Sequence, residues 1–155
     1  MFSTRVSRHV KAARAEVYRA LLDRRAVKAW RVPNGMTSEV HDFDPREGAT
    51  FRVSLSYDVA NDVGKTSTHT DTYHGHFAKL VPDELVVETI EFETSIPEFR
   101  GVMTMTTALR DAEGGTDVVV QHEGLPAAVS SADNEAGTQM ALANLATLLE
   151  AGSNR

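Results

Sequence analysis

The stretch from Trp30 to Tyr57 constrains the fold more than any other part of this chain. A large aromatic residue stands just before a turn at Pro33 and Gly35, and a second turn ends at Gly48. Apolar side chains then alternate with polar ones, namely Phe51, Val53, Leu55 and Tyr57 with Thr50, Arg52, Ser54, Ser56 and Asp58. Such alternation is typical of a strand with one buried and one solvated face. The stretch therefore predicts a wall and a lid around a cavity, but it names neither a ligand nor a reaction.

A short helical region precedes this strand, and a series of strands follows it. Residues 3–10 alternate weakly and predict a first strand, whereas residues 12–23 carry apolar side chains at helical spacing. A second short helix should end at Trp30, before Pro33, because the residue before a proline avoids the helical region. The other strand candidates are residues 37–43, 66–80, 85–94, 101–110 and 116–123. Turn residues separate these candidates, which favours an antiparallel meander.

One long helix closes the chain, and it is the element that can cover the sheet. Its apolar stripe consists of Thr138, Ala141, Leu142, Leu145, Leu148 and Leu149. The helix should run from about 131 to 151, with Ser130 or Ser131 as its cap and Gly152 at its end. A one-sided sheet needs such a cover. We therefore predict an α+β fold in which a curved antiparallel sheet of about six or seven strands wraps around this helix, as one domain over residues 1–155.

Composition excludes several classes of function. The formal net charge is −6 and no run of Lys or Arg occurs, so the chain is not expected to bind nucleic acid. The absence of cysteine removes disulfides, thiol catalysis and cysteine metal sites. The first residues mix polar and basic side chains, and no later segment is apolar enough to insert into a membrane. We expect a cytoplasmic protein.

Several short motifs, read in order, resemble a known superfamily. They are Val17-Tyr18-Arg19-Ala20-Leu21, Trp30 with Pro33-Gly35-Met36, Phe43-Asp44-Pro45-Arg46-x-Gly48, Tyr73-x-Gly75-x-Phe77, Leu80-Val81-Pro82, Gly115-Thr116, His122-Glu123-Gly124-Leu125-Pro126 and Asp133-Asn134-Glu135-Ala136-Gly137 with Leu142, Leu145 and Ala146. This order resembles the SRPBCC superfamily of START proteins, polyketide cyclases and ligand carriers. Within it, the chain is similar to homologues of the activator of the ninety-kilodalton heat-shock protein ATPase. The resemblance implies a helix-grip fold with a deep apolar pocket between the sheet and the C-terminal helix.

The chain departs from this family at one position of the last helix. Many relatives carry tryptophan directly after the glycine that corresponds to Gly137, whereas this chain has Thr138. The apolar stripe places Thr138 toward the sheet. The resemblance therefore implies a pocket that has lost one bulky wall and is larger or differently shaped.

The candidate ligand-binding residues are mainly apolar and come from every part of the predicted sheet. They are Trp30, Phe43, Phe51, Val53, Leu55, Tyr57, Tyr73, Phe77, Met103, Met105, His122 and Thr138. Ligand pockets are mostly apolar with a few placed polar groups, which is the composition of this set. A filled core of the same residues is the alternative.

His122 and a carboxylate are the candidates for chemistry. His122 has the parity of Val118 and Val120, so its ring should face inward, where it could move a proton or bind a ligand carbonyl. Glu88, Glu91 and Glu93 lie on a strand with ambiguous parity, and a buried member of this set could act as an acid or base. Glu91 is the preferred partner of His122. The alternatives are a structural histidine and solvated carboxylates.

Two polar clusters have structural interpretations that we prefer. His69, Asp71, Tyr73, His74 and His76 could suggest a metal site, but His69 and Asp71 have the opposite parity to the other two histidines. An edge strand with polar side chains in water explains the same residues, so we expect no metal and no cofactor. Arg46 could reach over the pocket mouth, but a pairing with Asp42 or Asp44 that holds the turn is preferred.

Three functions remain as hypotheses. The first is binding of a small hydrophobic or amphipathic ligand in an internal cavity. The second is a polyketide cyclase-like or aromatase-like enzyme that uses His122 and a pocket carboxylate, although the sequence has no phosphate loop, nucleophile elbow or dinucleotide fingerprint. The third is a co-chaperone-like regulator of an ATPase. The small ligand is the expected partner, while a homodimer and a chaperone partner stay open.

Overall fold

The computed structural model describes residues 2–33, 35–57 and 70–153. Its elements are β1 (Phe2–Val10), α1 (Arg14–Leu21), α2 (Arg24–Trp30), β2 (Met36–Phe43), β3 (Thr50–Tyr57), β4 (Thr70–Val81), β5 (Leu85–Phe92), η1 (Pro97–Phe99), β6 (Val102–Ala112), β7 (Gly115–Leu125) and α3 (Ser131–Ser153). Each segment that the sequence predicts as helix or strand is therefore present, as far as the described residues extend.

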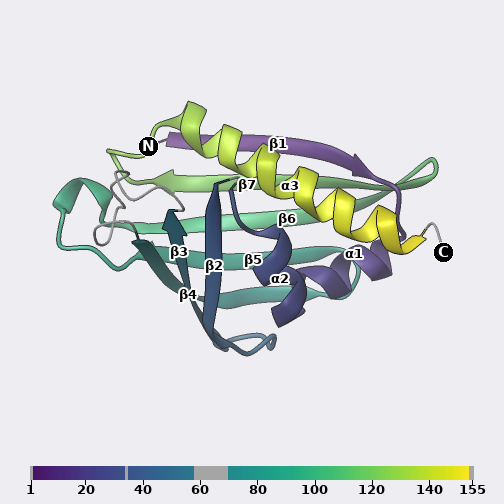
Figure 1. Cartoon of the computed structure of the whole chain (residues 1–155), viewed down its shortest axis with the longest axis horizontal. Helices are drawn as coiled ribbons and strands as arrows, with labels where there is room; N and C mark the ends of the chain where they lie inside the picture. Colours follow the sequence, from purple (N-terminus) through teal and green to yellow (C-terminus); the bar gives the residue numbers. More distant parts are fainter. Residues whose placement is uncertain (1, 34, 58–69, 154–155) are drawn as a thin grey trace.

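The strands of this part of the chain form one seven-stranded antiparallel sheet in the order β1-β7-β6-β5-β4-β3-β2. Helix α3 crosses the sheet and packs mainly along β1 and α2, with its far end near α1 (Figure 1). This is the helix-grip arrangement that the sequence predicts. One expectation is wrong: β4 is not an edge strand, because β3 and β5 pair with it on its two sides.

Side-chain caps position the helices that carry the site. The Asp23 carboxylate accepts hydrogen bonds from the backbone N–H groups of Arg25 and Ala26 and starts α2. The Ser130 hydroxyl accepts from the Asp133 N–H at the start of α3, as predicted. Helix α3 continues to Ser153, one residue beyond the predicted end at Gly152. None of the helices in the described residues has the length and apolar character that a bilayer span requires.

The inner face of the sheet holds a filled aromatic cluster beside the apolar stripe of α3. Phe77 lies edge-on to Phe43, with 5.6 Å between ring centroids, and 5.2 Å from Phe51. Phe51 in turn contacts Tyr73 at 6.3 Å. Phe51, Phe77 and Val53 are all at most 3% exposed. Burial on this scale makes the cluster part of the hydrophobic core that fixes the sheet.

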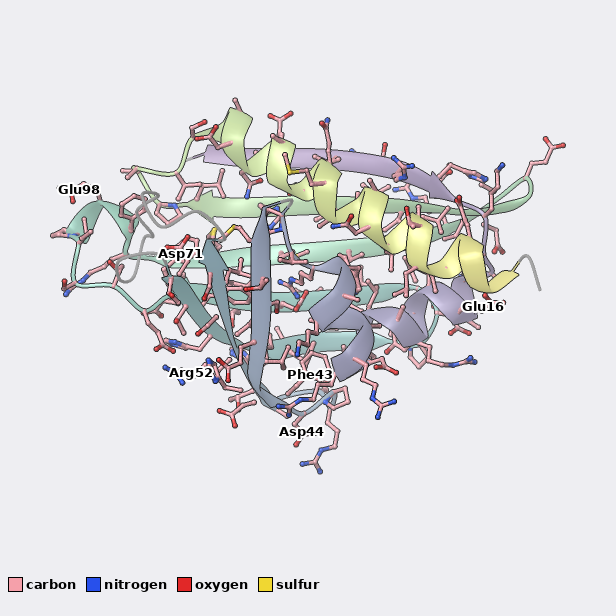
Figure 2. All side chains as sticks on the ribbon, in the orientation of Figure 1. Glu16, Phe43, Asp44, Arg52, Asp71 and Glu98 are labelled. Atoms are coloured by element: carbon pink, nitrogen blue, oxygen red, sulfur yellow. The ribbon has the colours of Figure 1, made fainter. Side chains whose placement is uncertain are left out.

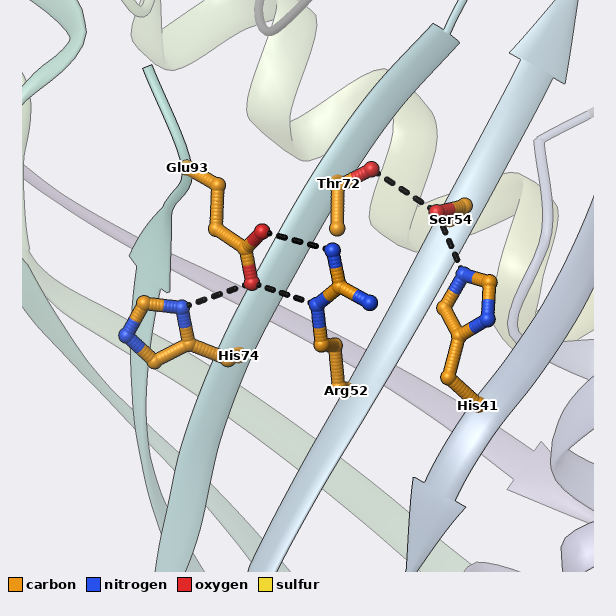
Figure 3. Close-up of polar contacts among 6 residues, drawn as sticks. All are labelled: His41, Arg52, Ser54, Thr72, His74 and Glu93. Carbon is orange, nitrogen blue, oxygen red and sulfur yellow. Dashed lines mark hydrogen bonds and ion pairs between the residues drawn. The ribbon is translucent and has the colours of Figure 1, made fainter. Parts of the chain in front are cut away.

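The outer face of β3 is less exposed to solvent than the alternation of its sequence predicts. Arg52 is exposed as expected, but Ser54 is only 8% exposed. Its hydroxyl lies 2.8 Å from Nε2 of His41 and 2.7 Å from the hydroxyl of Thr72, which is also buried (Figure 3). Neighbouring strands therefore cover Ser54 with polar partners, which removes the cost of burying its hydroxyl. Asp58, the last residue of the predicted pattern, lies outside the described residues.

Two glycines provide a test of the packing, because a methyl group meets very different surroundings at each. A Cβ on Gly75 would lie 1.7 Å from the backbone oxygen of Thr89, whereas a Cβ on Gly137 would meet nothing within 4 Å. We expect Gly75→Ala to lower the free energy of unfolding by about 3 kcal/mol. Gly137→Ala, within α3, should raise it by about 0.5–1 kcal/mol. Urea unfolding followed by circular dichroism measures both, and effects of the same sign would contradict this packing.

Candidate functional site

A partly open pocket of about 230 Å³ lies between α3, the end of α2 and the inner face of the sheet. Most of its walls are apolar. Its polar side chains come from β4, β7, α3 and the segment after α2. The lining residues are Trp30, Arg31, Val32, Pro33, Met36, Leu55, Asp71, Tyr73, Ile90, Phe92, Met103, Met105, Val120, His122, Val129, Asp133, Asn134, Gly137, Thr138, Ala141 and Leu142. Apolar walls with a few polar groups are the usual composition of a small-molecule site.

The structure divides the predicted ligand-binding residues into two groups. Those on the pocket lining are Trp30, Leu55, Tyr73, Met103, Met105, His122 and Thr138. Phe43, Phe51, Val53 and Phe77 instead pack in the core behind the lining. The side chain of Tyr57 lies outside the described part of the structure. The alternating strand β3 therefore contributes Leu55 to the lining, while its more deeply buried apolar residues support the wall from behind.

A buried ion pair lies at the polar end of the pocket, and only one of its two members was a sequence candidate. Nη1 of Arg31 is 2.6 Å from Oε1 of Glu88, and their side chains are 14% and 5% exposed. Nη2 of Arg31 lies 3.1 Å from the sulfur of Met105. The guanidinium also lies 5.9 Å and 5.6 Å from the ring centroids of Phe51 and Tyr73, within the range of cation–π contacts. Arg31 is thus a fixed cation with partners on several sides.

Strand register explains why these groups meet. Glu88 is the direct partner of Met105 across β5 and β6, and Met105 is the direct partner of His122 across β6 and β7. Directly paired residues of antiparallel strands share a face. The three side chains therefore form one row on the inner face, and Arg31 reaches this row from the end of α2.

The electrostatics of this row favour a neutral imidazole. Burial, and secondarily the positive charge of Arg31, lower the pKa of His122 to about 4. Burial alone would lower the pKa of Arg31, but the Glu88 carboxylate and Tyr73 keep it above its usual range. Nδ1 of His122 and Nε1 of Trp30 are buried with no hydrogen-bond partner among the described residues. The polar end thus combines a fixed cation, a neutral histidine and unused hydrogen-bonding capacity.

The predicted pair of His122 and Glu91 is wrong. Glu91 is the direct partner of His74 across β5 and β4, so the two side chains share the outer face. On that face Glu93 accepts hydrogen bonds from Nε and Nη2 of Arg52, at 2.8 and 2.9 Å, and lies 3.0 Å from Nδ1 of His74 (Figure 3). The hydrogen bond from Arg52 lowers the pKa of Glu93. Glu88 is the member of the set that faces inward, where it pairs with Arg31.

The polar residues of β4 do not form the metal cluster that their spacing invites. His74 pairs with Glu93, and Nδ1 of His76 lies 2.8 Å from the hydroxyl of Thr89. Asp71 is 2% exposed and lines the pocket, so it does not face water as expected for an edge strand. His69 lies outside the described residues. Within residues 2–33, 35–57 and 70–153, no three His, Asp or Glu side chains are arranged to hold a metal ion.

Arg46 belongs to the turn after β2. Its Nε and Nη2 donate to the two carboxylate oxygens of Asp44, at 2.8 and 2.6 Å, and both side chains are exposed. Figure 2 shows Asp44 at the lower edge of the molecule. The hydrogen bond from Arg46 lowers the pKa of the Asp44 carboxyl group. The preferred interpretation of Arg46 as a residue that holds the turn is confirmed.

Arg31 is the functional candidate that sequence reasoning missed. It follows the last residue of α2 and precedes Pro33 by two positions, in a segment already recognised as a pocket wall. Nδ2 of Asn144, on α3, donates to the backbone oxygen of Val32 at 3.0 Å. This bond ties the end of α2 to α3 and fixes the backbone next to Arg31. A search for the cation that a buried Glu88 requires could have found Arg31, since buried carboxylates are paired.

Comparison with known proteins identifies relatives of this chain. The family model described as activator of Hsp90 ATPase homolog 1-like protein matches residues 11–150. A crystal structure of a Chromobacterium violaceum protein is 29% identical, with a TM-score of 0.85 and 96% of both chains covered. The solution structure of an AHSA1-like protein from Aeromonas hydrophila is 14% identical, with a TM-score of 0.74, covering 99% of this chain and 96% of the other.

A third similar structure belongs to a protein of the dynemicin biosynthetic locus. It is 23% identical, with a TM-score of 0.68, and the match covers 97% of this chain but 48% of the other. At this identity the likeness concerns the fold. A comparison with curated proteins found no match.

The lowered pKa of His122 predicts how stability depends on pH. The folded protein holds His122 neutral down to a pKa of about 4, whereas in the unfolded chain its pKa is near 6.5. The stability that depends on a neutral His122 is therefore fully present above about pH 6.5 and is lost as the pH falls toward about 4. The loss amounts to about 3 kcal/mol in the free energy of unfolding. We expect the wild type to lose this much more stability than His122→Gln between about pH 7 and pH 4. Urea unfolding at a series of pH values measures the difference, and parallel curves for the two proteins would refute the prediction.

Proposed function

The chain belongs to the family of activator of Hsp90 ATPase homolog 1-like proteins, and on this premise we propose that it binds a small, mainly apolar molecule in the pocket under α3. The observation that carries the proposal is the lining itself, in which apolar side chains surround a few polar groups that include Arg31, Asp71 and His122. Pockets for drug-sized ligands measure about 300–1,000 Å³. A pocket of about 230 Å³ lies below that range and therefore suits a molecule smaller than a typical drug.

Burial of apolar surface supplies the affinity. Ile90, Met103 and Leu142 present apolar atoms to the pocket from β5, β6 and α3. Each Å² of apolar surface that a ligand removes from water contributes about 25 cal/mol, so a rigid aromatic ligand gains more than a flexible chain that must be ordered. The polar groups then determine how the ligand is oriented.

The pocket wall at Thr138 tests this proposal. Thr138 lines the pocket, and Thr147 lies exposed on the same helix; each donates its hydroxyl proton to the backbone oxygen four residues earlier. A tryptophan at 138 would fill space that a ligand needs. We expect Thr138→Trp to weaken binding of the neutral fluorescent probe N-phenylnaphthylamine by about tenfold or more, and Thr147→Trp to leave it unchanged. Probe titration measures both, after thermal unfolding has shown that the variants fold. Equal affinity in Thr138→Trp and the wild type would refute binding in this pocket.

Proton transfer is a second candidate function, and it is suggested by the position of His122 and Arg31 on the lining of the same pocket. A ring nitrogen of His122 would accept a proton from a carbon next to a ligand carbonyl. The electrons of the C–H bond would form an enolate, whose oxygen Arg31 would stabilise. The protonated imidazole would exchange its proton with water and then give a proton back to the carbon. This mechanism replaces the predicted His122–Glu91 pair.

Hydrogen exchange tests this second function without knowledge of the natural substrate. Acetylnaphthalene in heavy water should exchange its methyl hydrogens for deuterium faster in the presence of the wild-type protein. His122→Gln should abolish the acceleration while it still binds the probe, because a glutamine cannot act as a base at neutral pH. Proton NMR of the methyl signal measures the rate. No acceleration by a wild-type protein that binds the ketone would remove this candidate and leave the binding proposal intact.

A further inference from the structure

We propose that the pocket selects an uncharged ligand with a carbonyl oxygen, which accepts hydrogen bonds from Arg31, and that Glu88 sets this selectivity. The inference rests on the proposed function, because it concerns the occupant of the same pocket. It follows from the way in which the Arg31 cation is already neutralised.

Arg31 has donors left for a ligand. A guanidinium carries five N–H donors, and the hydrogen bonds of Arg31 go to Glu88 through Nη1 and to the sulfur of Met105 through Nη2. Sulfur is a weak acceptor. Arg31 lines the pocket and its side chain is 14% exposed, so its remaining N–H groups can meet a ligand oxygen there.

The N–H donors of Arg31 are available to a ligand, but its positive charge is not available to an anionic one. Glu88, at 2.6 Å and almost fully buried, already balances it. The other ionisable residues on the described lining are Asp71, Tyr73, Asp133 and His122, so that lining offers no second cation at neutral pH. A ligand carboxylate would leave water without a counter-ion of its own, which is strongly unfavourable. A carbonyl oxygen accepts the same hydrogen bonds and brings no charge to bury.

Two neighbouring residues strengthen the preference for an oxygen acceptor over a plain hydrocarbon. Trp30 and His122 both line the pocket, and each holds a buried nitrogen without a hydrogen-bond partner in the described part of the chain. The indole N–H is a donor only, and the neutral imidazole has one donor and one acceptor nitrogen. These two residues of the pocket wall thus hold hydrogen-bonding capacity that the described residues leave unused and that a plain hydrocarbon would not satisfy.

Three naphthalene probes of nearly equal shape separate these possibilities. They are naphthalene, acetylnaphthalene and naphthoic acid, which is ionised at neutral pH. Competition with N-phenylnaphthylamine gives their affinities for the intact protein. We expect acetylnaphthalene to bind about tenfold or more tightly than either of the others.

A matched pair of variants on β5 tests the role of Glu88. Glu88→Gln removes the charge that balances Arg31. The ratio of the variant's affinity for naphthoate to its affinity for acetylnaphthalene should therefore rise by about tenfold or more. Glu91→Gln makes the same change on the outer face of the same strand and should keep the wild-type ranking. Circular dichroism and thermal unfolding check that both variants are folded.

Each outcome decides the inference. If neither N-phenylnaphthylamine nor naphthalene binds, the proposed function fails, and this inference fails with it. If naphthalene binds as tightly as acetylnaphthalene, or naphthoate binds the wild type most tightly, the function stands and the carbonyl selectivity is overturned. A folded Glu88→Gln variant with the wild-type ranking overturns the role of Glu88. Should that variant not fold, the wild-type ranking still decides the ligand class.

Discussion

The ion pair of Arg31 and Glu88 is the interaction on which the pocket depends. It joins the end of α2 to the middle of β5 across a largely apolar interior. A guanidinium in such a place requires a counter-ion and hydrogen-bond acceptors. The position of Arg31 over the rings of Phe51 and Tyr73 adds two cation–π contacts. The same charge helps to keep His122 neutral. The pair therefore sets the charges at the polar end, and the Arg31 cation adds to the effect of burial on the protonation of His122.

The fold could be predicted from the sequence because its signals are local and repeated. Alternation in β3, helical spacing in α3 and the Pro33 turn each report on a few neighbouring residues, and together they leave few arrangements that bury one face of a sheet. Seven of the twelve predicted ligand-binding residues lie on the pocket lining, and most of these seven came from the same parity argument. The alternation within one strand does not show which strands lie next to each other. The position of β4 inside the sheet, and the burial of Ser54 by His41 and Thr72, could therefore be recognised only once the strand order was known.

The ion pair could not be predicted in this way. Glu88 and Arg31 are 57 residues apart, and a charged residue on an inner face contradicts the rule by which faces are assigned. In β5, carboxylates occupy both faces, so composition alone could not distinguish Glu88 from Glu91. Glu88 is identified by its partner, Arg31. Arg31 lies in the segment after α2, which the hydrogen bond from Asn144 to Val32 holds against α3. Tertiary structure had to supply that information.

Size and polarity of the pocket are controlled by different elements. Gly137 and Thr138 form part of the wall on α3, and nothing lies within 4 Å of where a Cβ on Gly137 would be. Arg31, Glu88 and His122 lie on the end of α2, β5 and β7. Relatives can therefore exchange a small residue for a large one on the helix and leave the charges untouched, or alter the charges and keep the volume. Under the proposed binding function, single substitutions would thus change the size of the pocket and its charges separately.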